Sequence, residues 1–161
     1  MGLVFSYEGK HGGEGMTDPY LAGLFRANPF ACKRPVEGEL VVVLQERLKN
    51  RGLKLMMPIS RAFCRGEIHE LIATEEEGLG PGQGVDKIAY LGFFEVLVGG
   101  VVVCGDEVYI GERRVGTVVG FDATHLPNHI NVVLGVSQGL TGTELGLGLG
   151  TRVFFRSPPE R

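Results

Sequence analysis

Glycine placement is the feature that most constrains the fold of this chain. Glycine occupies 26 of the 161 positions, well above the roughly 7% of average usage, and it shows no collagen-like period. The glycines separate short runs of Val, Ile, Leu and Phe. Because glycine adopts a positive φ without steric cost, this spacing is typical of short strands joined by tight turns. The sequence therefore predicts a mainly β protein with little helix.

Nine apolar runs are long enough to be strands. We expect them to form an all-β fold, a small and partly closed β-barrel, within a single domain of residues 36–161. The runs are residues 39–45, 53–59, 67–73, 87–98, 100–104, 107–111, 114–121, 129–136 and 151–156.

Residues 1–35 differ from the remainder and are predicted to form an N-terminal arm. The arm is polar and glycine-rich up to residue 17, and a short helix is expected over residues 18–28. Asp18 can cap that helix and Pro19 suits its first position, while Leu21, Leu24 and Phe25 fall on one face.

Residues 43–55 allow two interpretations. Good helix formers and an apolar stripe of Leu44 and Leu48 favour a short amphipathic helix that Gly52 would end. The alternative is a hairpin of two strands with its tip at residues 49–52, where Asn50 and Gly52 suit a turn. We favour the hairpin.

Charge and cysteine content limit the function classes. The net charge of −3 and the pI near 5.8 give no positive field for nucleic acid or an anionic membrane. No window approaches the roughly 18 apolar residues of a spanning helix. Cys32, Cys64 and Cys104 are odd in number and widely spaced, which favours free thiols in a reducing compartment. We therefore expect a cytoplasmic protein without nucleic-acid or membrane partners.

Two familiar catalytic patterns do not fit. The glycine-rich segment 144–150 leads directly into a strand-like run, whereas a dinucleotide-binding loop follows a strand and opens a helix. No GxSxG elbow is present, and Cys104 lies in a run of valines where a thiol is more often inert. The sequence predicts neither a cofactor nor a catalytic residue.

The segment FDATHLPNHINVV (121–133) holds the clearest candidate site. Asp122, His125 and His129 are close enough in sequence to converge on a ligand or a metal. Pro127 argues against a helix that would place the two histidines on one face. The competing interpretation, which we favour, is a polar loop whose histidines satisfy backbone groups at the start of a strand.

The same region resembles a known family. IGERRVGTVVGF (110–121), the loop with His125, Leu126 and Asn128, the strand HINVVL (129–134) and the final strand GTRVFFRS (150–157) resemble the barrel of the glucitol/sorbitol-specific IIA component of the bacterial phosphotransferase system. The resemblance covers residues 88–156.

This resemblance implies a barrel topology and raises the question of a phosphorylated histidine. Members of that family carry the phosphoryl group on a histidine in an early barrel strand, near a Phe-Cys pair. The colinear segment KIAYLGFFEV (87–96) has no histidine. AFCRGEIHE (62–70) contains Phe-Cys and His69 but lies upstream, so His69 enters only as a further candidate ligand residue.

Together these features predict a non-enzymatic, homo-oligomeric module that binds a small ligand or serves an accessory role. The predicted ligand-binding residues are Asp122, His125, His129 and His69. The alternative is a phosphocarrier similar to the IIA component, or a small metal-dependent enzyme.

Overall fold

A computed structural model describes residues 19, 22–23 and 28–159 of the chain. Within these residues the protein contains strands and loops but no helix. The strands are β1 (Val36–Val43), β2 (Arg47–Leu48), β3 (Leu53–Lys54), β4 (Ser60–Phe63), β5 (Ile68–Thr74), β6 (Gly84–Val85), β7 (Ile88–Val98), β8 (Gly100–Val103), β9 (Glu107–Ile110), β10 (Arg113–Asp122), β11 (Asn131–Gly135) and β12 (Arg152–Arg156).

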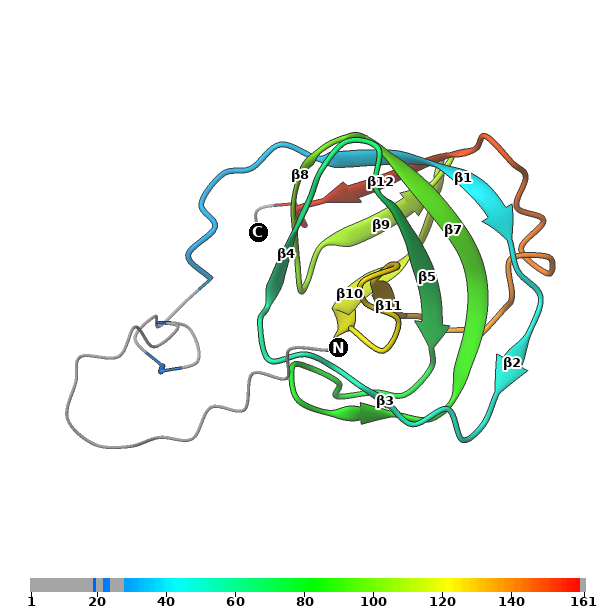
Figure 1. The fold of residues 1–161 in the computed structure, drawn as a ribbon, viewed down its shortest axis with the longest axis horizontal. Coiled ribbons are helices and arrows are strands. Elements are labelled where there is room, and N and C mark those ends of the chain that lie inside the picture. Colours follow the sequence, from blue (N-terminus) through cyan, green and yellow to red (C-terminus); the bar gives the residue numbers. More distant parts are fainter. Residues whose placement is uncertain (1–18, 20–21, 24–27, 160–161) are drawn as a thin grey trace.

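The main sheet closes on itself. Its strands follow the order β1-β12-β9-β10-β11-β5-β7-β2, and a further pairing of β1 with β7 completes a ring (Figure 1). Every pairing in the ring is antiparallel except that of β5 with β11, which is parallel. Closure satisfies the edges of β1 and β7, which would otherwise expose unpaired backbone groups.

Apolar side chains at alternate positions of the strands fill the interior of the ring. In β5, Leu71 and Ala73 face the interior, as do Leu91 and Phe94 of β7. The larger interior side chains include Phe63, Phe121 and Phe155, which stack tilted or edge-on with their neighbours. The two-residue period of a strand therefore places the intervening residues of β5 on the outer face of the ring.

A second apolar cluster covers part of that outer face. Leu53 of β3 and Val85 of β6 pair in a two-stranded sheet, seen below the ring in Figure 1. They pack with Ile72 of β5 and Val133 of β11. Because these residues alternate with interior ones, β5 and β11 are buried on both faces, as parallel strands usually are.

Gly92 allows β1 and β7 to approach closely enough to close the ring. A Cβ atom at this position would lie 2.1 Å from the carbonyl oxygen of Val42. That separation is far inside van der Waals contact, so a side chain would force the two strands apart. This glycine, which lies inside the predicted strand run 87–98, is therefore needed for ring closure and not for a turn.

The predicted all-β class is confirmed, and each of the nine predicted runs overlaps a strand. The predicted hairpin at residues 49–52 is wrong, because β2 pairs with β7 and β3 pairs with β6. The alternative helix there is absent too, since long-range pairing with two different strands overrides local propensity. Most of the predicted helix 18–28 lies outside the described residues, and Pro19, Ala22 and Gly23 form turns.

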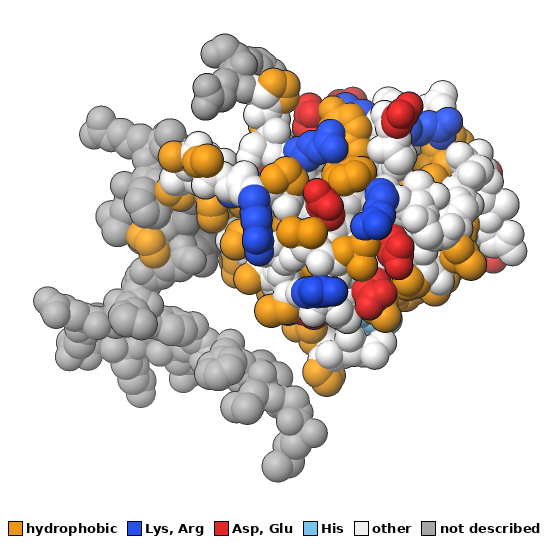
Figure 2. Space-filling view, turned by 90° about the horizontal axis from the view of Figure 1, so that it is seen from above, with side chains coloured by type: hydrophobic (Ala, Val, Ile, Leu, Met, Phe, Trp, Pro, Cys, Tyr) orange, Lys and Arg blue, Asp and Glu red, His pale blue; other side chains and the backbone are white. Residues whose placement is uncertain are grey.

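The described residues include no helix with the length and apolar character that a membrane span needs. Lys, Arg, Asp and Glu side chains are intermixed with hydrophobic ones on the face drawn in Figure 2.

Candidate metal-binding site

The last residue of β10 and the loop that joins β10 to β11 carry three of the four predicted site residues. The loop is built of turns rather than helix, as Pro127 predicted. Asp122 ends β10 and anchors this loop. Its Oδ1 accepts hydrogen bonds from Thr124 N (3.1 Å) and Asn131 Nδ2 (3.0 Å), and its Oδ2 accepts one from Thr124 Oγ1 (2.9 Å). The buried Asp122 carboxylate therefore holds the two ends of the loop together.

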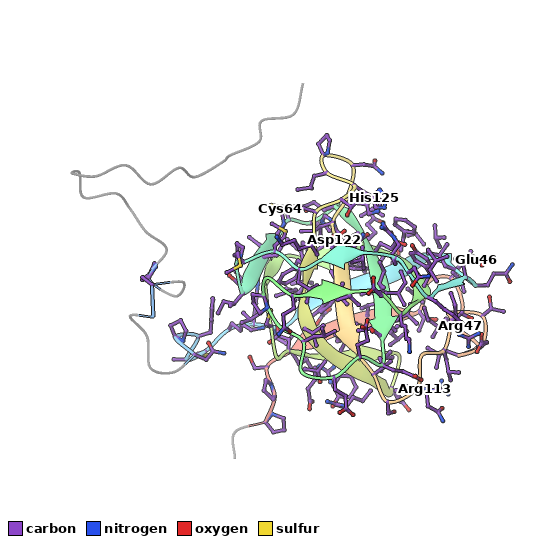
Figure 3. All side chains as sticks on the ribbon, turned by 90° about the horizontal axis from the view of Figure 1, so that it is seen from below. Glu46, Arg47, Cys64, Arg113, Asp122 and His125 are labelled. Atoms are coloured by element: carbon purple, nitrogen blue, oxygen red, sulfur yellow. The ribbon has the colours of Figure 1, made fainter. Side chains whose placement is uncertain are left out.

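The two loop histidines lie against each other. Their rings stack with centroids 4.9 Å apart and an interplanar angle of 24°. His129 is 8% exposed, whereas His125 is exposed on the loop (Figure 3). Nε2 of His129 lies 3.1 Å from Oε2 of Glu70, which is only 5% exposed. The structure thus brings His125 and His129 together with a carboxylate from a distant strand.

Glu70, His125 and His129 form a set that can hold a metal ion. One ligand atom from each lies within 4.8 Å of the other two. Ligand atoms around a tetrahedral zinc ion lie about 3.4 Å apart, given metal–ligand distances near 2.0–2.2 Å. His125 is the exposed member of the set, and a rotation of its side chain would have to close the remaining gap. Asp122 is not part of this set, in which Glu70 accompanies His125 and His129.

Strand register explains how Glu70 reaches the loop. In the parallel pair of β5 and β11, Glu70 lies opposite Asn131, two residues after His129. Glu70 also alternates with interior residues of β5, so its side chain emerges on the outer face where the loop folds over it.

Hydrogen bonding sets the present tautomer of His129. Nδ1 of His129 lies 2.9 Å from Nδ2 of Asn128 and accepts a hydrogen bond from this amide, so Nε2 carries the proton and donates to Glu70. A metal at Nε2 requires that nitrogen to lose its proton. Rotation of the Asn128 amide would then present Oδ1 to an Nδ1–H, the type of outer partner that orients metal-bound histidines.

The surroundings of Glu70 disfavour the ionised form of its carboxyl group. Burial raises the pKa of this carboxyl group, while the hydrogen bond and charge of His129 oppose the rise. The edge of Phe93 packs against the His129 ring with centroids 5.0 Å apart. A carboxylate buried beside an aromatic ring gains more from a cation than an exposed one does.

His69 lies in a different environment. It faces the interior, 4.6 Å from the Phe63 ring. Its Nε2 donates to Glu67 Oε2 (2.5 Å), and its Nδ1 accepts from Ile130 N (3.0 Å). Burial lowers the pKa of His69, although the hydrogen bond with Glu67 acts in the opposite direction. Both ring nitrogens of His69 make hydrogen bonds, and the side chain is 4% exposed. His69 is not part of the set formed by Glu70, His125 and His129.

Two cavities, of about 580 and 470 Å³, lie near the end of β5. The larger also borders the start of β7, and the smaller borders the start of β10 and the segment 136–145. Both reach Ala73, which faces Ala89 across the β5–β7 pair. Arg47, which lines the larger cavity, is paired with Glu144. Neither cavity is lined by the histidine cluster, and Figure 3 shows Arg47 well apart from His125.

Glu70, His125 and His129 all fall within a segment that matches a known family. Residues 30–156 match a family of unknown function, DUF6917. The chain belongs to this family. No curated protein and no solved structure matches the chain. For this DUF6917 protein, the resemblance to the glucitol/sorbitol-specific IIA component stays a prediction.

Sequence reasoning missed Glu70 because 59 positions separate it from His129. One signal was available: a carboxylate stands inside the apolar run of β5 in this DUF6917 chain, where a buried charge needs a partner. Nothing in the sequence shows that β5 pairs in parallel with β11, so the identity of that partner could not be derived.

Proposed function

We propose that this DUF6917 protein binds a divalent transition-metal ion at Glu70, His125 and His129. The observation that carries the proposal is the convergence of two imidazoles and one carboxylate, with ligand atoms within 4.8 Å of one another. The small-ligand module expected from the sequence then becomes a metal-binding module whose ligand lies at the β10–β11 loop.

The donor set favours zinc over calcium or magnesium. Two nitrogen donors and one carboxylate suit Zn²⁺ and similar ions, whereas calcium and magnesium prefer all-oxygen sites. Three protein ligands leave a coordination position open, as in catalytic zinc sites, while structural sites are closed by four. His125 lies on the exposed side, which gives that open position access to solvent.

The phosphocarrier alternative has less support. Phosphorylation requires an imidazole with one accessible nitrogen. Both nitrogens of His69 make hydrogen bonds, to Glu67 and to Ile130 N. Among the histidines of the described residues, only His125 is exposed. Incubation with phosphoenolpyruvate and the general phosphotransferase proteins tests this alternative directly.

Zinc titration of chelator-treated protein tests the proposal. The parent should bind one ion and melt at a higher temperature, because an ion at 100 times its dissociation constant stabilises by about 2.7 kcal/mol. His125→Ala should abolish both effects and leave the melting temperature without zinc nearly unchanged, since this side chain is exposed.

Glu46→Gln is the matched control, since Glu46 is exposed and lies apart from His125 (Figure 3). This variant should bind zinc as the parent does. Zinc binding that survives in His125→Ala, or its absence from the parent, would contradict the proposal.

A further inference from the structure

Arg51 approaches the candidate metal site from the connection between β2 and β3. Its Nη2 lies 3.5 Å from Nε2 of His125, and its Nε donates to the hydroxyl of Tyr90 at 3.1 Å. Arg51 is half-buried, and Tyr90 projects from β7 on the same outer face as Phe93. The guanidinium is therefore held beside the ligand set rather than extended into solvent.

No carboxylate of the described residues lies within 4.0 Å of the Arg51 guanidinium. Asp86, whose backbone carbonyl accepts from Arg51 N, directs Oδ1 to the N–H of Gly52 instead. A half-buried cation usually has an anionic partner, because desolvation is otherwise uncompensated. Within the described part of the protein, Arg51 thus makes no direct ion pair, and its charge acts on the Glu70 carboxyl group only at longer range.

A bound metal ion increases this imbalance. Zn²⁺ beside the Arg51 guanidinium faces a single carboxylate, Glu70, because the histidine ligands bind as neutral imidazoles. The filled site therefore carries an excess of positive charge in a partly desolvated position. Such an excess attracts an anion strongly, since the ion is the largest local charge.

We propose that the metal-loaded site binds a small oxyanion, a carboxylate or a phosphate group, between the open coordination position and Arg51. This inference rests on the proposed metal-binding function and names the class of ligand. One oxygen completes the metal coordination, and a second accepts from an Nη–H of Arg51. Tyr90 is the positioning residue, because its hydroxyl holds Nε while Nη2 lies near His125.

Reciprocal linkage gives the test. An anion that binds only beside the metal must raise the affinity for the metal by the same factor as the metal raises the affinity for the anion. Zinc titrations of the full chain are therefore done in a chloride-free buffer, with sodium acetate, with inorganic phosphate, or with neither. We expect at least one anion to tighten zinc binding by about tenfold.

Two substitutions locate the effect. Arg51→Gln should reduce the coupling to less than about twofold while zinc still binds in the absence of anion. Tyr90→Phe should weaken the coupling partially. Lys54→Gln is the matched control for loss of one positive charge, since Lys54 is exposed on β3, and it should keep the full coupling.

The outcomes separate the two proposals. If the parent binds no zinc, the proposed metal-binding function fails, and the oxyanion proposal fails with it. If zinc binds but neither anion changes its affinity, or if Arg51→Gln keeps the coupling, only the oxyanion proposal is overturned. Coupling by acetate alone assigns a carboxylate ligand, and coupling by phosphate alone assigns a phosphate ligand.

Discussion

Glu70→Gln should separate a metal ligand from a structural carboxylate. Glutamine has nearly the same shape as glutamate and keeps an oxygen that can accept from Nε2 of His129. It removes a charge whose burial raises the pKa of Glu70, which means that the folded state disfavours the ionised form. Replacement of a buried ionic group by a neutral one of similar shape is often neutral or stabilising.

The expected magnitude follows from these contacts. In the presence of chelator, the free energy of unfolding of Glu70→Gln should equal that of the parent or exceed it by up to about 1 kcal/mol. Zinc affinity should fall by more than about 100-fold, because loss of even an outer partner of a metal ligand costs 10–100-fold. The Glu70→Gln variant is thus expected to be at least as stable as the parent and yet to bind zinc poorly.

Urea unfolding with chelator and with saturating zinc measures both quantities. The parent should gain about 2.7 kcal/mol when zinc is at 100 times its dissociation constant, and Glu70→Gln should gain almost nothing. Glu46→Gln should behave as the parent in both conditions. A Glu70→Gln protein that loses more than about 2 kcal/mol in chelator and responds to zinc like the parent would refute the reasoning, because Glu70 would then be a structural partner of His129.

Three further predictions concern the fold around the site. Asp122→Ala removes three hydrogen bonds of the loop and should lower the free energy of unfolding by about 2–3 kcal/mol in urea; a loss below about 0.5 kcal/mol would show that the loop does not depend on this carboxylate. Gly92→Ala should cost at least about 2 kcal/mol because its Cβ would meet the carbonyl of Val42, whereas Gly80→Ala, with open space around it, should stay within about 0.5 kcal/mol. Burial lowers the pKa of His69 below its ordinary 6.5, so the unfolded state binds the extra proton and stability should fall as the pH drops below about 6.5; His69→Gln should flatten that part of the urea-derived profile, and an unchanged slope would contradict this assignment.

The sequence predicted local elements better than their partners. The β-branched runs around Val132 and Phe94 are strands because alternation and flanking glycines are local signals. The connection that contains Arg51 was misassigned because β2 and β3 are two residues long and each depends on a strand far along the chain. Neither propensity nor turn chemistry encodes such pairings.

In the candidate site, too, the sequence predicted the residues that are close along the chain and missed the distant one. His125 and His129 lie together in the structure as their spacing suggested, and Pro127 excluded a helix between them. Asp122 was a reasonable third ligand by proximity in sequence, yet its oxygens hold the loop. Glu70 lies beside the two histidines instead, because a parallel strand register, which leaves no periodic signal, brings it beneath the loop.

The parallel contact of β5 with β11 also affects the order in which the chain assembles. Glu70 and His129 are 59 residues apart, and contacts across such a separation form late because the intervening chain must first be ordered. The residues of the proposed metal site therefore come together only when the ring is nearly complete, so an ion bound there would not nucleate folding. It would instead retard the first separation of the two strands, and slow unfolding more than it speeds folding.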